Sequence, residues 1–84
     1  MQEHVVLLPE HAGPLLRALR VQQGFSQKAF ARQLGISAPT LSVLEKDASA
    51  ASLRRVMRVL SLLGMELVVR PRVSGDGDGA TSPW

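Results

Sequence analysis

The chain has 84 residues and no cysteine, so it forms one small domain without a disulfide or a thiolate metal site. A domain of this size buries only about 60–65% of its unfolded surface, so a second copy is an expected source of further apolar burial. The longest apolar run, residues 5–8, is far too short to span a membrane and lacks the basic flank and cleavage site of a signal peptide. These features favour a cytoplasmic protein.

Positive charge is concentrated in the middle of the chain. Residues 11–64 contain eight Lys and Arg but only two acidic residues, which gives this segment a net charge of +6. A field of this sign attracts polyanions and accelerates their association. A solvated basic face is the alternative interpretation, so charge by itself does not assign a function.

The spacing of apolar residues predicts four helices, bounded by serine caps and terminal glycines. We expect them within residues 11–24, 26–35, 37–46 and 52–64. Pro14 suits the first turn of the first helix, and the N-caps of the other three are Ser26, Ser37 and Ser52. The predicted inward-facing residues are Leu15, Leu16, Leu19, Phe30, Leu34, Leu41, Leu44, Leu53, Val56, Met57, Leu60 and Leu63.

The second and third predicted helices have the spacing of a helix-turn-helix. Ala31 provides the small residue that is needed where the two helices cross, and four residues later Gly35 allows the positive φ of the turn. Six residues further on, Leu41 is placed to fold back under the second helix, and Ile36 occupies another inward position. The capped helix and this spacing together indicate a DNA-binding motif more strongly than the charge does.

Residues 65–70 alternate between apolar and mixed positions, with Met65, Leu67 and Val69 on one face, and Pro71 ends the alternation. This pattern predicts a strand, which needs a hydrogen-bonded partner. Residues 4–8 and the same strand of a second subunit are the two candidates. We favour the second subunit, because a two-fold axis pairs an antiparallel strand with itself. The predicted dimerisation residues are Met65, Leu67, Val68 and Val69.

Residues 73–84 have the composition of a flexible tail. Their Asp-Gly alternation lacks the spaced ligands and closing Glu of an EF-hand calcium loop. Trp84 at the end is either incidental or a signal for a protease or a partner. We therefore divide the chain into an N-terminal extension (1–10), a helix-turn-helix domain (11–64), a dimerisation strand (65–72) and a tail (73–84).

Residues 25–45, FSQKAFARQLGISAPTLSVLE, resemble the Xre/Cro-type helix-turn-helix family, and the resemblance covers about residues 11–64. It implies a mainly α, lambda-repressor-like bundle of four to five helices that binds operator DNA as a dimer. The segment GMELVVRPR that follows is similar to the HipB-like antitoxins, in which a C-terminal β-strand pairs across the homodimer. The resemblance then implies that the dimer represses its own operon and restrains a HipA-type serine/threonine kinase toxin. A terminal tryptophan such as Trp84 also fits this family.

The resemblance and the helix caps together assign the DNA contacts. The residues are Ser26, Gln27, Lys28, Arg32, Ser37, Ala38, Pro39, Thr40, Ser42, Val43 and Lys46. Thr40 and Ser42 can hydrogen-bond to a phosphate or a base edge, whereas Ala38 and Pro39 offer only apolar contact, for example to a thymine methyl. Val43 stands where many relatives carry a basic or amide side chain, which argues against strong guanine recognition.

Gln27 opens the second helix, where the family places a glutamine near a phosphate or a base. Glu45 is expected to make a structural bond. Pro39 falls in the first turn of the third helix, where no intrahelical hydrogen bond is lost. Phosphate contacts are expected from outside this helix, and the candidates are Lys28 and Arg32 on the second helix, Lys46 after the third, and Arg17 or Arg20. An ordinary exposed side chain is an equal alternative for each of them. An acidic protein, the DNA backbone and simple solubility are equal alternatives for Arg54, Arg55 and Arg58.

An enzyme is not expected, because the chain has no cysteine, no tyrosine and no carboxylate pair at catalytic spacing. No cofactor or metal site is predicted, and His11 is interpreted as a helix-start residue. Three functions remain: an antitoxin that autorepresses its operon and binds a kinase toxin, a stand-alone dimeric repressor, and a protein-binding module with vestigial DNA affinity. The first is favoured.

Overall fold

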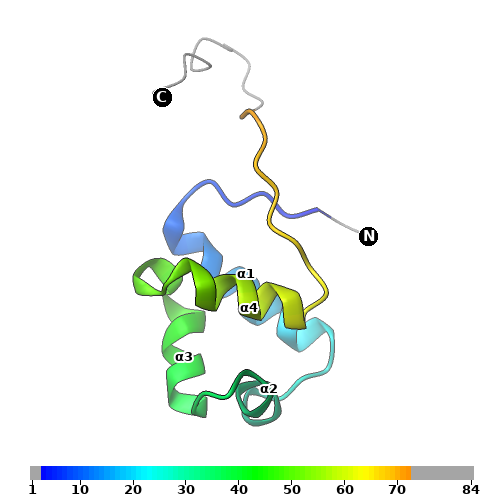
Figure 1. Cartoon of the computed structure of the whole chain (residues 1–84), viewed down its shortest axis with the longest axis vertical. Coiled ribbons are helices and arrows are strands. Elements are labelled where there is room, and N and C mark those ends of the chain that lie inside the picture. Colours follow the sequence, from blue (N-terminus) through cyan, green and yellow to red (C-terminus); the bar gives the residue numbers. More distant parts are fainter. Residues whose placement is uncertain (1–2, 73–84) are drawn as a thin grey trace.

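The computed structural model describes residues 3–72, which form a small helical bundle. The elements in chain order are η1 (Pro9–His11), α1 (Ala12–Gln22), α2 (Gln27–Leu34), α3 (Ala38–Lys46), η2 (Ala48–Ala50) and α4 (Leu53–Leu62) (Figure 1). The four α-helices lie within the four predicted ranges, so the predicted mainly helical fold is confirmed. The predictions for residues 73–84, including Trp84, lie outside the described residues.

Three serine side chains begin helices as predicted. The Oγ atoms of Ser26, Ser37 and Ser52 accept hydrogen bonds from the backbone N–H groups of Ala29, Thr40 and Arg55 at 3.1, 3.2 and 3.1 Å. Each cap satisfies a donor that the helix itself cannot pair, and each stabilises its helix by about 1 kcal/mol. The cap on Ser37 makes Pro39 the second residue of α3, so the proline removes no intrahelical hydrogen bond.

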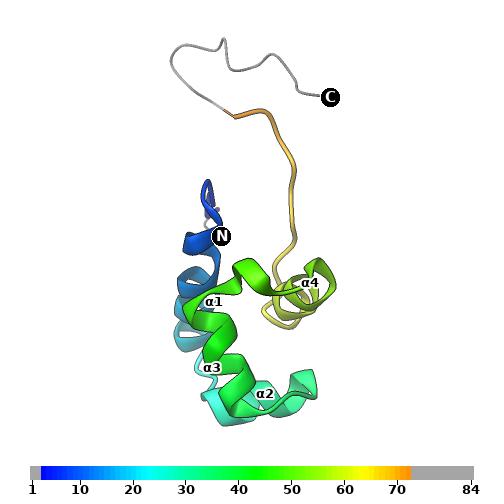
Figure 2. The ribbon, with the colours of Figure 1, turned by 90° about the vertical axis from the view of Figure 1, so that its left-hand side faces the viewer.

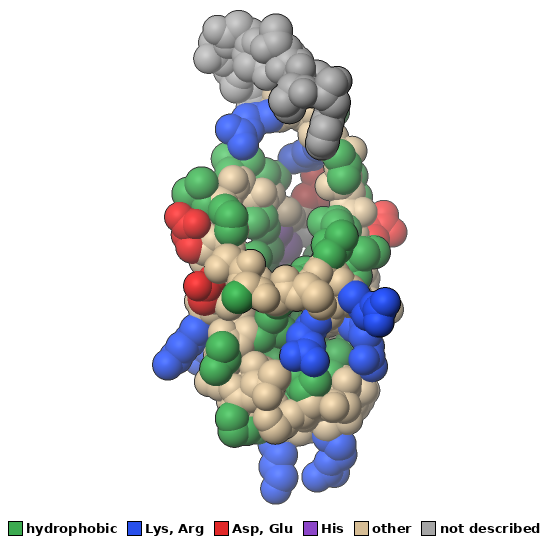
Figure 3. All heavy atoms as spheres, turned by 60° about the vertical axis from the view of Figure 1, so that its left-hand side comes forward, with side chains coloured by type: hydrophobic (Ala, Val, Ile, Leu, Met, Phe, Trp, Pro, Cys, Tyr) green, Lys and Arg blue, Asp and Glu red, His purple; other side chains and the backbone are tan. Residues whose placement is uncertain are grey.

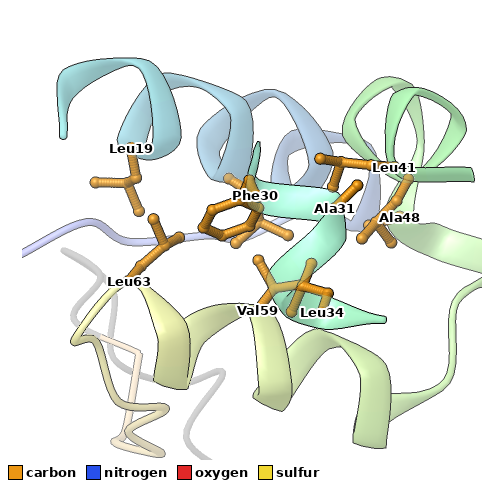
Figure 4. Packing of buried hydrophobic residues seen from close by; sticks show 10 residues of the cluster. Leu19, Phe30, Ala31, Leu34, Leu41, Ala48, Val59 and Leu63 are labelled. Atoms are coloured by element: carbon orange, nitrogen blue, oxygen red, sulfur yellow. The ribbon is translucent and has the colours of Figure 1, made fainter. Parts of the chain in front are cut away.

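The core lies where the four helices meet (Figure 4). Its largest fully buried side chains are Phe30 of α2, Leu41 of α3 and Val59 of α4, and Leu19 of α1 and Leu63 pack against them. All of these residues except Val59 were predicted to face inward.

The α1 backbone approaches the end of α3 closely at Gly13. A Cβ atom at Gly13 would lie 2.7 Å from the carbonyl oxygen of Leu44 and 2.8 Å from that of Glu45. Both contacts are with backbone, which cannot move aside as a flexible side chain can. Glycine at this position therefore allows α1 to pack directly against the end of α3.

The predicted inward face of α4 is wrong in part. Val59 is 1% exposed and Leu63 is also buried, but Leu53 and Met57, which were expected to face inward, are 62% and 48% exposed. At about 100° per residue, Leu53 and Met57 lie about 120–160° around the helix from Val59. The apolar arc of α4 is wider than its contact with the core, so one edge of it remains in solvent. We name Leu53, Val56, Met57 and Leu60 the outer α4 stripe.

The predicted strand is not among the elements of residues 3–72. Residues 65–72 leave α4 as an extended trace without regular secondary structure, and residues 3–8 also lack it (Figures 1 and 2). Arg70 Nη1 donates to Glu3 Oε1 at 3.2 Å, an ion pair between two exposed side chains that links these segments. A strand requires a neighbour that pairs its backbone groups, and no such neighbour lies beside residues 65–70 in the described chain.

Within residues 3–72, no helix is long and apolar enough to cross a membrane.

Candidate nucleic-acid interface

The turn between α2 and α3 sets the direction of the recognition helix. Gly35 has a φ of +75°, and its N–H donates to the carbonyl of Arg32 at 3.1 Å while the N–H of Ile36 donates to that of Ala31 at 3.0 Å. This pair of bonds is a Schellman motif, which closes a helix by satisfying its last carbonyls. Ser37 then caps α3 two residues after Gly35. The tight turn that the Ala31–Gly35–Leu41 spacing predicted is confirmed.

Helix α3, the second helix of the motif, turns one side to the core and the other to solvent. Leu41, Leu44 and Glu45 are buried, whereas the opposite side carries Pro39, Thr40, Ser42, Val43 and Lys46. We name these last five residues the α3 outer face. Ser42 is half-buried at its edge, as is Ala38, and the other four are exposed. Five of the six α3 residues assigned to DNA contact thus lie together on one accessible side of α3, and the sixth, Ala38, is half-buried and lies outside this face.

The hydroxyl groups of Ser37 and Thr40 hydrogen-bond to each other, with their oxygens 2.8 Å apart. Ser37 Oγ also accepts the capping bond from the N–H of Thr40. A hydroxyl has a single proton to donate, so one of the two protons lies between the oxygens and the other is left for an outside acceptor. The pair therefore offers DNA one hydroxyl donor, which suits a phosphate oxygen.

Helix α2, the first helix of the motif, carries exposed basic side chains next to α3. Lys28 and Arg32 are exposed, and the hydroxyl oxygen of Ser26 accepts the cap bond from Ala29 N–H, which leaves the hydroxyl proton of Ser26 and the first N–H groups of α2 for an outside acceptor. Figure 3 shows Lys and Arg side chains projecting from the end of the molecule at which α2 lies. The exposed bases of α2 can therefore contact phosphates next to the α3 outer face.

A buried ion pair underlies the interface. Arg20 Nε donates to Glu45 Oε2 at 2.6 Å and Arg20 Nη2 donates to Glu45 Oε1 at 3.1 Å, and the two residues are 6% and 3% exposed. Arg20 Nη1 donates a third bond to the carbonyl of Phe25 at 2.7 Å. The pair joins α1 to the end of α3 and to the segment that enters α2. The interpretation of Glu45 as a structural residue is confirmed, and that of Arg20 as a phosphate contact is wrong because its guanidinium is buried.

Gln27 belongs partly to the same network. Its Nε2 donates to Glu45 Oε1 at 3.1 Å, and the side chain is half-buried. Since a carboxylate oxygen can only accept, the nitrogen must face Glu45. The amide orientation of Gln27 is therefore fixed, with its oxygen and one N–H left for another partner. The sequence predicted Gln27 at the DNA interface but did not reveal its hydrogen bond to Glu45.

Two arginines of α4 lie near the turn, a placement that the sequence pattern does not reveal. Arg55 and Arg58 line a small hollow together with Leu34 and Ile36.

Because Arg20 and Glu45 neutralise each other, the exposed bases of residues 11–64 still exceed the acids by six. The exposed surface of residues 11–64 thus keeps the full positive charge of the domain.

The four predicted dimerisation residues follow α4, in the segment that runs from the end of α4 away from α2 (Figure 1). Met65 is half-buried against the core, and its N–H donates to the carbonyl of Leu60 at 2.8 Å. Leu67, Val68 and Val69 are exposed, and Val69 is 93% exposed.

The comparison with protein-family models matches residues 16–69, which run from α1 through all of α4 into the segment beyond it, to the model HTH_3, helix-turn-helix. No curated protein matches the chain. The matched span contains the Schellman turn, the α3 outer face and the capped helices described above. The chain belongs to the helix-turn-helix family HTH_3 and is a DNA-binding regulator.

Proposed function

We propose that the protein is a homodimeric antitoxin of the HipB-like kind, which represses its own operon and binds a HipA-type serine/threonine kinase toxin. Its role is binding and not catalysis. The observation that carries the DNA-binding half is the α3 outer face, held outward by the Schellman turn and flanked by the exposed bases of α2. A basic field of this kind attracts the operator, and the α3 side chains then select its sequence.

Exposed apolar surface supports the dimer. The outer α4 stripe and the segment Leu67–Val69 present large apolar side chains to solvent on consecutive parts of the chain. A small domain gains stability when such surface is covered by a second copy. A two-fold axis would pair residues 65–70 of the two subunits as antiparallel strands and place two α3 helices at a fixed distance, as a palindromic operator requires.

The toxin half of the proposal is supported by the similarity of residues 64–72 to the HipB-like antitoxins. The stand-alone dimeric repressor is the alternative, and it differs only in having no protein partner. The two functions share the DNA interface, so DNA binding alone does not separate them.

Expression of the native operon with a tag on this chain alone separates the two functions. Co-purification of an untagged kinase, together with a gel shift of the upstream DNA, is expected for the antitoxin. A gel shift without a bound neighbour would establish the stand-alone repressor. If neither the upstream DNA nor a neighbour binds, the proposed function is wrong.

A further inference from the structure

The centre of the α3 outer face is apolar. Val43 is 67% exposed in the middle of the helix, and Pro39, one turn earlier, is exposed beside it at the i, i+4 spacing that makes neighbours on a helix surface. Val43 contributes little to the core at this exposure. Scattered apolar residues on a surface need no explanation, but these two occupy the side that a helix-turn-helix protein turns into the major groove.

The polar groups around this apolar pair are few and already partly engaged. Helix α3 contains no Arg, Asn or Gln, and its one Lys is its last residue, Lys46. The hydroxyls of Ser37 and Thr40 keep one free proton between them. The bidentate pairs that proteins use to recognise guanine and adenine require Arg or Lys and Asn or Gln respectively. The α3 outer face does not supply such a group at its centre.

The major groove presents one apolar group that discriminates between bases, the C5-methyl of thymine. An apolar side chain packed on this methyl removes both surfaces from water, whereas the same side chain against a guanine or adenine edge leaves polar atoms unpaired. Val43 lies within the first two turns of α3, the part of a recognition helix that contacts base edges.

We propose that Val43, with Pro39 beside it, is a specificity-determining residue of this protein and recognises a thymine methyl in each operator half-site. The inference rests on the proposed DNA-binding function and names a base that the protein selects in its operator. The half-site then has thymine opposite the middle of α3. Phosphate contacts from Lys28 and Arg32 supply affinity that does not depend on this base.

Deoxyuridine tests the contact, because it pairs as thymidine does and lacks only the methyl group. The full chain is used to select duplexes from a random-sequence library, and the selected duplex is then made with uracil in place of one thymine at a time. Removing one methyl-sized apolar contact should weaken binding about fourfold, and removing it from both half-sites should weaken binding on the order of tenfold. Fluorescence anisotropy at one fixed salt concentration measures these changes.

The variant Val43→Ala identifies the protein side of the contact. It should weaken binding to the thymine duplex on the order of tenfold, as uracil in both half-sites does, because both subunits carry the change. In this variant the uracil substitution at that position should be nearly neutral, since the two changes remove the same contact. Val21→Ala, at an exposed valine of α1, is the matched control and should leave both affinities unchanged. Because both valines are exposed, circular dichroism should show the same helical content for both variants.

The outcomes separate the inference from the proposed function. Specific selection with no uracil effect, or uracil and Val43→Ala effects that simply multiply, would overturn the inference and leave sequence-specific DNA binding in place. A selection that yields no sequence preference at all would overturn the proposed function itself.

Discussion

Arg20 and Glu45 form a buried ion pair that joins three parts of the fold. Their side chains are 7% and 2% exposed, and Gln27 and the carbonyl of Phe25 complete their hydrogen bonds. Within residues 3–72, no buried side-chain nitrogen or oxygen lacks a partner. Removing one member of such a pair leaves the other charge buried and unpaired, which costs far more than the pair contributes as a whole.

Arg20→Met is therefore expected to lower the free energy of unfolding by about 3–5 kcal/mol. Urea unfolding followed by circular dichroism measures the change. Arg17→Met, at an exposed position of the same helix, is the control and should change stability by less than about 0.5 kcal/mol. The double variant Arg20→Met, Glu45→Leu should recover much of the loss. Equal stability of Arg20→Met and Arg17→Met would show that the pair is not structural.

Asp47 provides a pH-dependent contact at the start of η2. Hydrogen bonds from the side chain and backbone of Ser49 hold the pKa of Asp47 below its usual value of 3.8, and the backbone bond, from Ser49 N–H to Asp47 Oδ1, is 2.9 Å long. A lowered pKa means that the charged form is stabilised by folding, so this contribution is present above about pH 3.8 and is lost as the pH falls through the lower folded value.

The difference in unfolding free energy between the native protein and Asp47→Ala should accordingly be largest at neutral pH and should shrink below pH 3.8. Urea titrations at several pH values between neutral and strongly acidic give this difference directly. A difference that stays constant over the whole range would show that the carboxylate charge has no part in the cap.

At the scale of single elements, the outer α4 stripe leaves the most apolar side-chain surface of any helix in solvent within residues 3–72. Val56 and Leu60 are half-buried, and Leu53 and Met57 are exposed. In the proposed dimer this stripe is covered, so a charge placed in it opposes association while leaving the fold of one chain intact.

Met57→Asp should therefore shift the sedimentation equilibrium from dimer toward monomer at micromolar concentration, with unchanged helical content. Arg55→Gln changes the net charge by the same amount on the opposite side of the same helix, and it should leave the dimer intact. If both variants remain dimeric, the stripe is not part of the interface; if the native chain is already a monomer, the proposed dimer is wrong.

The elements also show what the sequence can specify. The caps at Ser26, Ser37 and Ser52 and the positive φ of Gly35 were predictable because each depends on residues within one turn. The Arg20–Glu45 pair spans 25 positions, and its only local sign is that each residue follows an inward leucine, Leu16 or Leu41, by four.

The side of α4 that meets the core was not predictable, because seven apolar residues within 53–63 leave the phase of its apolar arc open. The predicted strand at 65–70 needs a hydrogen-bonded neighbour, and its alternating pattern does not specify whether residues 4–8 or a second subunit provides one. Local chemistry thus fixed the motif, while the contacts between distant parts of the chain required the structure.

The whole molecule separates two kinds of surface. Lys and Arg side chains project from the end at which α2 lies, whereas at the other end apolar side chains gather along the N-terminal and C-terminal segments, with a few Lys and Arg side chains among them (Figure 3). In the proposed complex the first end meets phosphates and the second meets another subunit. Affinity from charge and selectivity from the α3 outer face then come from different residues, and they should respond differently to salt.

The salt dependence of binding distinguishes these two contributions. Each phosphate that a base neutralises adds about −0.9 to the slope of log K against log salt concentration. If Lys28 and Arg32 each contact a phosphate in both half-sites, replacing either by Gln should make the slope shallower by about 2, for specific and random DNA alike. Val43→Ala should lower affinity for the selected duplex without changing the slope, because a methyl contact releases no counterion. Anisotropy titrations across a series of salt concentrations measure both effects, and a Val43→Ala variant with a shallower slope would show that the change had displaced the whole interface.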